Sequence, residues 1–226
     1  MFGINLNELN YFLSAIPFSF MALFPVVNPL GGAFVILALT VGTPSNLYNQ
    51  VCRKIALNTF ILLLIVFFLG TYFLEFFGIS LHIVEVGGGI VVAFIGWNLL
   101  NQSPNKNTES KTNTNTASKN ILASAFYPFT MPITAGPGAM AVVLTINAHE
   151  TLKSNLGITL FAQAGAVIGI LLVAITVYLC YRYAAIITRR LGTTGTQVIV
   201  RLSAFIIFCI GLQIAWNGLQ HLFNLT

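Results

Sequence analysis

Long apolar runs separated by short polar segments dominate the hydrophobic pattern of this chain. Each run is close to the roughly 20 residues that cross a bilayer as a helix. The pattern therefore predicts an all-α polytopic membrane protein with six transmembrane helices. The six runs occupy residues 11–40, 55–79, 83–100, 121–146, 156–181 and 198–223.

Composition argues against the alternative that these runs form the core of a soluble domain. Apolar residues make up 57% of the chain and charged residues 7%, whereas soluble domains carry about a quarter charged residues. The lipid bilayer is therefore the expected solvent. The net charge of +5 is scattered at the ends of the apolar runs, which argues against a nucleic-acid-binding surface. The first run has no basic flank and further spans follow it, so we expect it to stay in the mature protein.

The distribution of basic residues predicts the topology in the inner membrane. Most of them lie in the loops after the first, third and fifth spans. Because basic loops stay in the cytoplasm, both termini are expected on the outer side. The loop at 101–120 is almost entirely Asn, Thr, Ser and Lys, a composition that cannot form a packed core. We expect it to be a disordered cytoplasmic linker.

The two parts that this linker separates, 1–100 and 121–226, share a motif. Phe24-Pro-Val-Val-Asn-Pro-Leu30 in the first span matches Tyr127-Pro-Phe-Thr-Met-Pro-Ile133 in the fourth, and glycines follow each motif. Each part contains three spans, which is an odd number, so the second part must enter the membrane from the opposite side. The sequence therefore predicts two inverted three-helix repeats.

The prolines and glycines of these motifs predict that the first and fourth helices are discontinuous. Proline removes a backbone donor and glycine permits angles that a helix forbids. An unbroken helix of thirty residues would also be roughly 45 Å long, well beyond the hydrocarbon core of about 30 Å. Unwound backbone must be sheltered from lipid, so we expect both breaks to border one polar cavity near the midplane.

The breaks also predict the ligand. Unpaired amides and positive dipole ends at the half-helix N-termini attract a carboxylate, and carbonyl, Asn and Thr groups suit an ammonium or hydroxyl. A small zwitterionic solute is the expected partner. The alternative is that the prolines only kink the helices for packing. The predicted substrate-binding residues are Asn28, Pro29, Gly31, Gly32, Thr130, Pro132, Thr134, Gly136 and Gly138.

No catalytic residue, metal ligand or cofactor is predicted. The chain has no GxxxxGK[ST], HExxH or GxSxG motif and no CxxC pair. Glu85 is expected to snorkel to the interface, and Tyr181 to lie in an aromatic belt. The small-xxx-small pattern at Gly165 and Gly169 fits close helix contact within one protomer or between two. The sequence therefore does not decide whether the protein forms a homo-oligomer.

The strings FPVVNPLGG and MPITAGPGAM, with GGGIVVAFIGW in the third span, resemble the MarC family of integral membrane proteins over nearly the whole chain. That family includes a transporter of small neutral amino acids. The resemblance therefore implies glycine or alanine as substrates and leaves room for coupling to Na⁺ or H⁺. We expect a secondary transporter or exporter that works by alternating access, not an enzyme. A passive small-solute channel and a non-transporting membrane scaffold are the alternatives.

Overall fold

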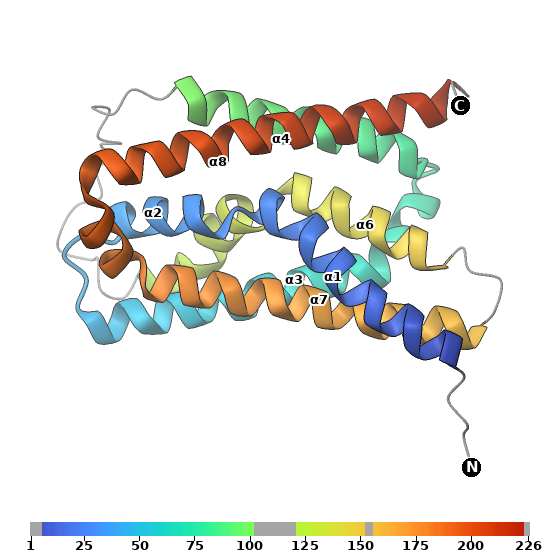
Figure 1. Cartoon of the computed structure of the whole chain (residues 1–226), viewed down its shortest axis with the longest axis horizontal. Helices are drawn as coiled ribbons and strands as arrows, with labels where there is room; N and C mark the ends of the chain where they lie inside the picture. Colours follow the sequence, from blue (N-terminus) through green and yellow to red (C-terminus); the bar gives the residue numbers. More distant parts are fainter. Residues whose placement is uncertain (1–5, 102–120, 152–155, 224–226) are drawn as a thin grey trace, which may run out of the picture.

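The computed structural model describes residues 6–101, 121–151 and 156–223, and these contain helices but no strand (Figure 1). The predicted linker lies outside the described residues except for Asn101, the last residue of α4. The helices are α1 (Leu6–Val27), α2 (Pro29–Leu39), α3 (Ser45–Phe76), α4 (Leu81–Asn101), η1 (Ala125–Thr134), α6 (Pro137–Thr151), α7 (Leu156–Arg182) and α8 (Ala184–Leu222).

The helices form a bundle with two distinct ends. At the terminal end lie the start of α1 and the end of α8 (Figure 1). At the opposite, linker end lie the end of α4 and the bend of α8 at Gly192, whose φ is 68°. Among the described residues, five segments are long and apolar enough to cross a membrane. The bent pair of η1 and α6 makes a sixth if it counts as one span, so the prediction of an all-helical membrane protein is confirmed.

The break in the first span is confined to one residue. Asn28 lies between α1 and α2 in the left-handed conformation, with φ 47° and ψ 64°. Backbone hydrogen bonds continue across it, because Asn28 N–H donates to the Phe24 carbonyl and Gly32 N–H donates to the Asn28 carbonyl. Pro25 lies inside α1 without ending it. The first span is therefore interrupted but not unwound over several residues.

The break in the fourth span is much larger. Tyr127 and Met131 have extended angles inside η1, with φ near −120°, because each precedes a proline whose ring disfavours the helical region for its neighbour. The chain resumes as α6 at Pro137 after a bend of 67°. The two motifs thus differ in outcome, although in both the chain leaves the helix at the residue before the second proline.

Glycines set the contact between α1 and α7, which lie side by side (Figure 1). A Cβ atom added at Gly169 would lie 2.9 Å from the Ile16 carbonyl oxygen, and one at Gly165 would meet the Phe12 carbonyl oxygen. Side chains larger than hydrogen are therefore excluded there. The small-xxx-small pattern that the sequence left open serves a contact inside one protomer.

Glycines also set the antiparallel contact between α4 and α8. Gly89 and Gly96 are seven residues apart on α4, as are Gly211 and Gly218 on α8, so each pair lies on one helix face. A Cβ at Gly89 would meet the backbone of α8 at Ala215. Lipid gives helices no hydrophobic reason to associate, so this close backbone approach supplies the van der Waals contact that holds the pair.

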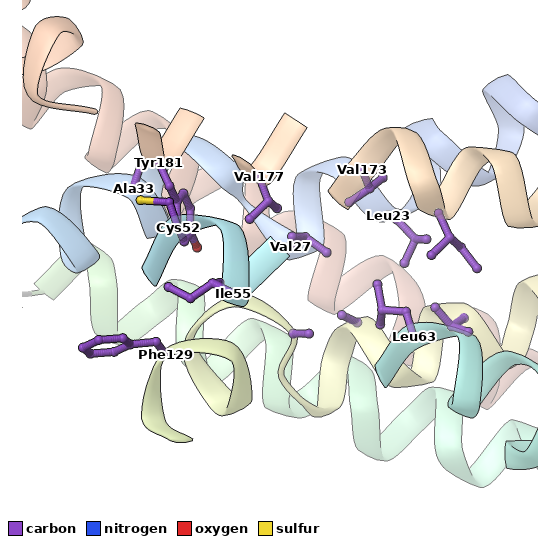
Figure 2. Close-up of a cluster of buried hydrophobic side chains, with 14 of the residues drawn as sticks. Leu23, Val27, Ala33, Cys52, Ile55, Leu63, Phe129, Val173, Val177 and Tyr181 are labelled. Atoms are coloured by element: carbon purple, nitrogen blue, oxygen red, sulfur yellow. The ribbon is translucent and has the colours of Figure 1, made fainter. Parts of the chain in front are cut away.

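The apolar core lies between α1, α3, α7 and η1 (Figure 2). Leu23 and Val27 of α1 contribute to it together with Ile55 and Leu63 of α3, and all four side chains are buried. Many other large side chains of these helices are exposed on the outside of the bundle, among them Met21, Ile65 and Leu171, as expected for a surface that faces lipid. The core therefore joins the first, second, fourth and fifth spans behind the two breaks.

The α4–α8 contact predicts that replacing Gly89 with alanine lowers the free energy of unfolding by about 1–3 kcal/mol, because the new methyl group meets backbone that cannot move aside. Unfolding of the purified protein in detergent would measure this. Gly87→Ala is the matched control, since a Cβ at Gly87 meets nothing within 4 Å. Equal stability of the two variants would contradict the packing described here.

Candidate functional site

A cavity of about 550 Å³ lies beside both helix breaks, within the range of small-molecule sites. Its walls come from α2, η1 and the start of α6 on one side and from α4 and α8 on the other. The two proline motifs, about one hundred residues apart in sequence, therefore reach one cavity. Seven of the nine predicted residues line it, namely Asn28, Gly31, Gly32, Pro132, Thr134, Gly136 and Gly138.

The remaining two predicted residues, Pro29 and Thr130, are not part of the cavity wall. Pro29 is buried as the first residue of α2, where its missing N–H costs nothing. Thr130 is fully buried, and its hydroxyl donates to the Ala125 carbonyl oxygen at 2.7 Å. The structure thus assigns these two residues to the helix breaks themselves.

Two threonines supply side-chain donors to backbone carbonyls of η1. Thr130 and Thr134 each follow a proline by two residues, and each hydroxyl donates to the carbonyl five residues earlier, at 2.7 and 2.8 Å respectively. A backbone acceptor left unpaired at this depth would cost several kcal/mol. The two Pro-x-Thr steps therefore make the unwound segment tolerable inside the membrane.

Tyr181 forms part of the structure behind the cavity wall, so its prediction as an interfacial belt residue was wrong. The side chain is fully buried (Figure 2). Its hydroxyl lies 2.8 Å from Thr134 Oγ1, and a Cβ added at Gly32 would meet it. Depth along α7 suggested the belt, but the helix face decides burial: Val173 and Val177, on the same face, are also fully buried.

The hydrogen-bond donors at the two half-helix N-termini differ from the prediction. Asn28 Oδ1 accepts from Gly31 N–H at 3.1 Å and caps α2, so the amides of Gly31 and Gly32 are already paired and that part of the prediction was wrong. At the start of α6, Met140 N–H donates to the Gly136 carbonyl. Among the described residues, the amides of Gly136, Gly138 and Ala139 have no acceptor, and all three residues line the cavity. The helix N-terminus that offers unpaired amides is therefore that of α6.

The cavity carries no formal charge. All of its lining residues are uncharged, and most are Val, Ile, Leu, Ala or Phe. The lining residues with polar side chains are Asn28 and Thr134, and the backbone at the start of α6 adds further polar groups. Such a lining suits a solute that is small and has no net charge.

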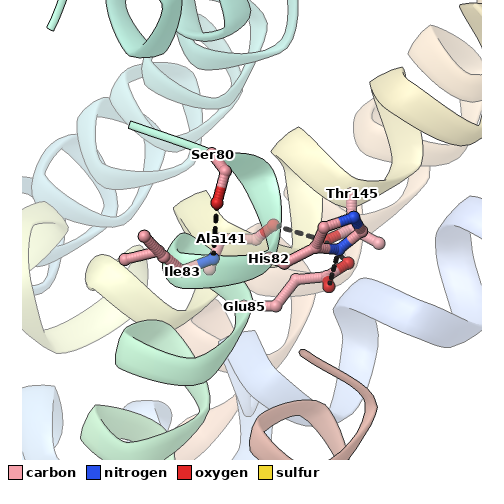
Figure 3. A network of polar contacts seen from close by, with 6 residues as sticks. All are labelled: Ser80, His82, Ile83, Glu85, Ala141 and Thr145. Carbon is pink, nitrogen blue, oxygen red and sulfur yellow. Dashed lines mark hydrogen bonds and ion pairs between the residues drawn. The ribbon is translucent and has the colours of Figure 1, made fainter. Parts of the chain in front are cut away.

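Glu85 is buried outside the cavity, so the prediction that it snorkels was wrong. The residue is 7% exposed, and its carboxyl group contacts Thr145 Oγ1 of α6 at 3.2 Å and His82 Nδ1 at 3.3 Å (Figure 3). A Cβ at Gly218 of α8 would lie 2.9 Å from the Glu85 Cβ. Close packing of three helices, which a single span does not reveal, covers this side chain.

Comparison with known proteins identifies relatives along most of the chain. A family model described as MarC family integral membrane protein matches residues 13–223. The membrane protein YvbG of Bacillus subtilis is 31% identical over 90% of this chain and 93% of its own length. The inner membrane protein MarC of Escherichia coli is 30% identical over 92% of this chain and 95% of its own length. No solved structure matches the chain significantly.

We expect the hydrogen bond between the Tyr181 hydroxyl and Thr134 to contribute measurably to stability. Tyr181→Phe removes the partner of Thr134 and should lower the free energy of unfolding by about 0.5–1.5 kcal/mol, the net worth of one hydrogen bond. Tyr178→Phe is the control, because the Tyr178 hydroxyl bonds the exposed Arg182, and such surface contacts contribute little. A larger loss for Tyr178→Phe in detergent unfolding would refute the assignment of Tyr181.

Proposed function

This chain belongs to the MarC family of integral membrane proteins and is a multi-pass protein of the inner membrane, and on that premise we propose that it is a secondary transporter of small neutral amino acids such as glycine or alanine. One observation carries the proposal: two interrupted helices from the two halves of the chain border a single uncharged cavity. Midplane cavities of this kind bind substrate in secondary transporters.

The packing of the helices supports two inverted repeats. In such an arrangement the first three spans correspond to the last three, so each contact should recur with its partners exchanged. The first span packs on the fifth, as α1 on α7, and the fourth packs on the second, as η1 and α6 on α3. The third and sixth spans, α4 and α8, pack on each other. This exchange of partners is the pattern expected for a pseudo-twofold axis in the membrane plane.

The polar groups of the cavity support a zwitterionic solute. Its carboxylate would accept from the unpaired Ala139 amide at the positive end of α6. Its ammonium group would donate to Thr134 Oγ1 or to the carbonyl groups at the bend. The apolar walls leave no partner for a charged side chain, which would be costly to bury there. The proposed substrates therefore have small, uncharged side chains.

The strength of binding follows from the number of open helix ends. One partly buried helix end contributes up to about 2 kcal/mol, and millimolar binding requires about 4 kcal/mol. Because Asn28 already caps α2, the N-terminus of α6 is the one helix end left to bind the solute, whereas the sequence suggested two. The remaining roughly 2 kcal/mol must come from the Thr134 hydroxyl, the Asn28 amide and the apolar walls.

The position of the cavity fits one state of an alternating-access cycle. Besides the breaks, its lining includes Leu39 of α2, Leu99 of α4 and Val200 of α8, which lie toward the linker end of the bundle. If the basic loops place that end in the cytoplasm, the cavity reaches toward the cytoplasm. Transport then requires a second state in which the cavity opens at the terminal end.

Counterflow in proteoliposomes tests this proposal. Purified protein would be reconstituted into liposomes loaded with unlabelled glycine or alanine, and uptake of labelled substrate would be followed with and without Na⁺ and H⁺ gradients. A carrier is accelerated by substrate on the opposite side. Flux without such acceleration would instead indicate a passive channel, and no flux of any small amino acid would overturn the proposal in favour of a scaffold.

Gly138→Leu should slow exchange strongly while the protein still folds. A Cβ at Gly138 already meets Val92, and the longer side chain would fill the cavity beside the α6 N-terminus. We expect exchange to fall by about tenfold or more, which corresponds to about 1.4 kcal/mol. Gly87→Leu is the control, because Gly87 faces open space. Unchanged exchange in folded Gly138→Leu protein would argue against this cavity as the transport site.

A further inference from the structure

The cavity at the helix breaks is polar at one end and apolar over the rest of its length. The polar side chains of its wall, Asn28 and Thr134, lie at the two breaks, as do the unpaired amides at the start of α6. Apolar side chains of α2, α4 and α8 continue the wall beyond the breaks toward the linker end. A solute that fills the whole cavity must therefore have a polar head and an apolar tail.

The apolar part of the wall is built at regular helical spacing. On α4 the lining residues Val92, Ile95 and Leu99 follow one another at steps of three and four residues, and on α8 Val200 and Ile207 are seven residues apart. Each set therefore lies on one helix face. Since seven residues of helix span about 10 Å, the apolar part is a continuous slot along these helices and not an isolated gap.

The volume of the cavity exceeds what glycine or alanine needs. At roughly 30 Å³ per non-hydrogen atom, the share that one water molecule has in the liquid, glycine and alanine occupy about 150–180 Å³ and leucine about 270 Å³. The cavity has about 550 Å³. Glycine or alanine bound at the polar end would leave more than half of it unfilled, and apolar walls offer water few hydrogen-bond partners. This part of the cavity is therefore available to a larger side chain.

The apolar wall can also stabilise a larger side chain. Val35 and Leu39 of α2 are each 37% exposed, and Ile95 of α4 is 38% exposed, so all three keep apolar surface that a ligand can cover. Each methylene group that a ligand buries against such surface raises its affinity by about fourfold. Leucine has three more carbon atoms than alanine, so it should bind at least about tenfold more tightly.

A lipid acyl chain is the other candidate for an apolar slot inside a membrane, but it does not match the polar end. The amides of Gly136, Gly138 and Ala139 would stay unpaired beside it, and unpaired buried amides are costly. An amino acid pairs these donors through its carboxylate and covers the apolar wall with its side chain. One ligand of this class thus fits both parts of the cavity.

We propose that the cavity binds neutral amino acids with large apolar side chains, such as leucine, more tightly than glycine or alanine. The carboxylate and the ammonium group lie at the helix breaks, and the side chain lies between α2, α4 and α8. The inference rests on the proposed function for its amino acid head group, and it extends the substrates to larger side chains. A polar side chain of the same size finds no partner on this wall, so its chemistry and not its size excludes it.

Isothermal titration calorimetry of the purified, full-length protein in lipid nanodiscs tests this selectivity without a transport assay. We expect the affinity to rise from glycine through alanine to leucine, with leucine at least about tenfold above alanine. Asparagine is the matched control ligand, because it has as many non-hydrogen atoms as leucine and nearly the same shape. Its side-chain amide should make it bind at least about tenfold more weakly than leucine. Leucine should also give a more negative heat-capacity change than alanine.

A pair of valine variants tests where the ligand side chain lies. Val35 lines the cavity one helical turn beyond Gly31, whereas Val91 of α4 is not part of the wall, and both valines are 37% exposed. Val35→Phe should lower the ratio of leucine affinity to glycine affinity by about tenfold or more, because the new ring occupies the space in which leucine gains its apolar contacts. Val91→Phe should keep the wild-type ratio.

The outcomes separate this inference from the proposed function. Leucine binding no tighter than alanine, asparagine binding as tightly as leucine, or an unchanged ratio in folded Val35→Phe protein would overturn the selectivity, while exchange of glycine or alanine would still support the transporter. The expected series, in protein that exchanges no amino acid in the counterflow assay, would leave the binding site standing and refute transport. Binding of none of these amino acids would overturn both proposals, with lipid as the remaining occupant of the apolar wall. If Val35→Phe does not fold, the ligand series in the wild-type protein decides.

Discussion

Backbone polar groups cannot be left unpaired in hydrocarbon, where each costs several kcal/mol, and the arrangement around both helix breaks follows from this constraint. At the first break Asn28 takes the left-handed conformation and its side chain caps α2. At the second, the hydroxyls of Thr130 and Thr134 donate to the carbonyls of Ala125 and Phe129 within the broken segment. Tyr181 then holds Thr134 from the neighbouring helix. At the start of α6 the amides of Gly136, Gly138 and Ala139 have no acceptor among the described residues, and all three residues line the cavity.

The same solvent explains why glycines decide which helices stay together. Helices gain little from hydrophobic burial when lipid surrounds them, so close backbone contact must hold them. Gly165 and Gly169 bring α7 against α1, and Gly89 and Gly211 bring α4 against α8. The cavity lies between the α4–α8 pair and the elements that carry the breaks, α2, η1 and the start of α6. A division into two bodies with a cavity between them is what a rocking carrier requires, and it agrees with the proposed transport cycle.

Polar residues that serve neither break are placed by contacts between helices. Glu85 appeared from sequence to lie near an interface, where a charge can reach water, but α6 and α8 cover it. Tyr181 appeared to belong to an aromatic belt, but its helix face points into the core. In both cases the sequence indicates only the position of the residue along its helix. The direction of the side chain depends on neighbours that are distant in sequence.

The sequence by itself determined the membrane class, the approximate spans, the two proline motifs and seven of the residues that line the cavity, because hydrophobic length and the geometry of proline and glycine are local properties. It could not determine that Asn28 confines one break to a single residue while the other spreads over η1. It also could not assign donors to acceptors at Gly31, Thr130 or Glu85. Those outcomes depend on which helices meet, and only the tertiary structure decides that, since each buried polar group must find its partner among the groups that packing brings within reach.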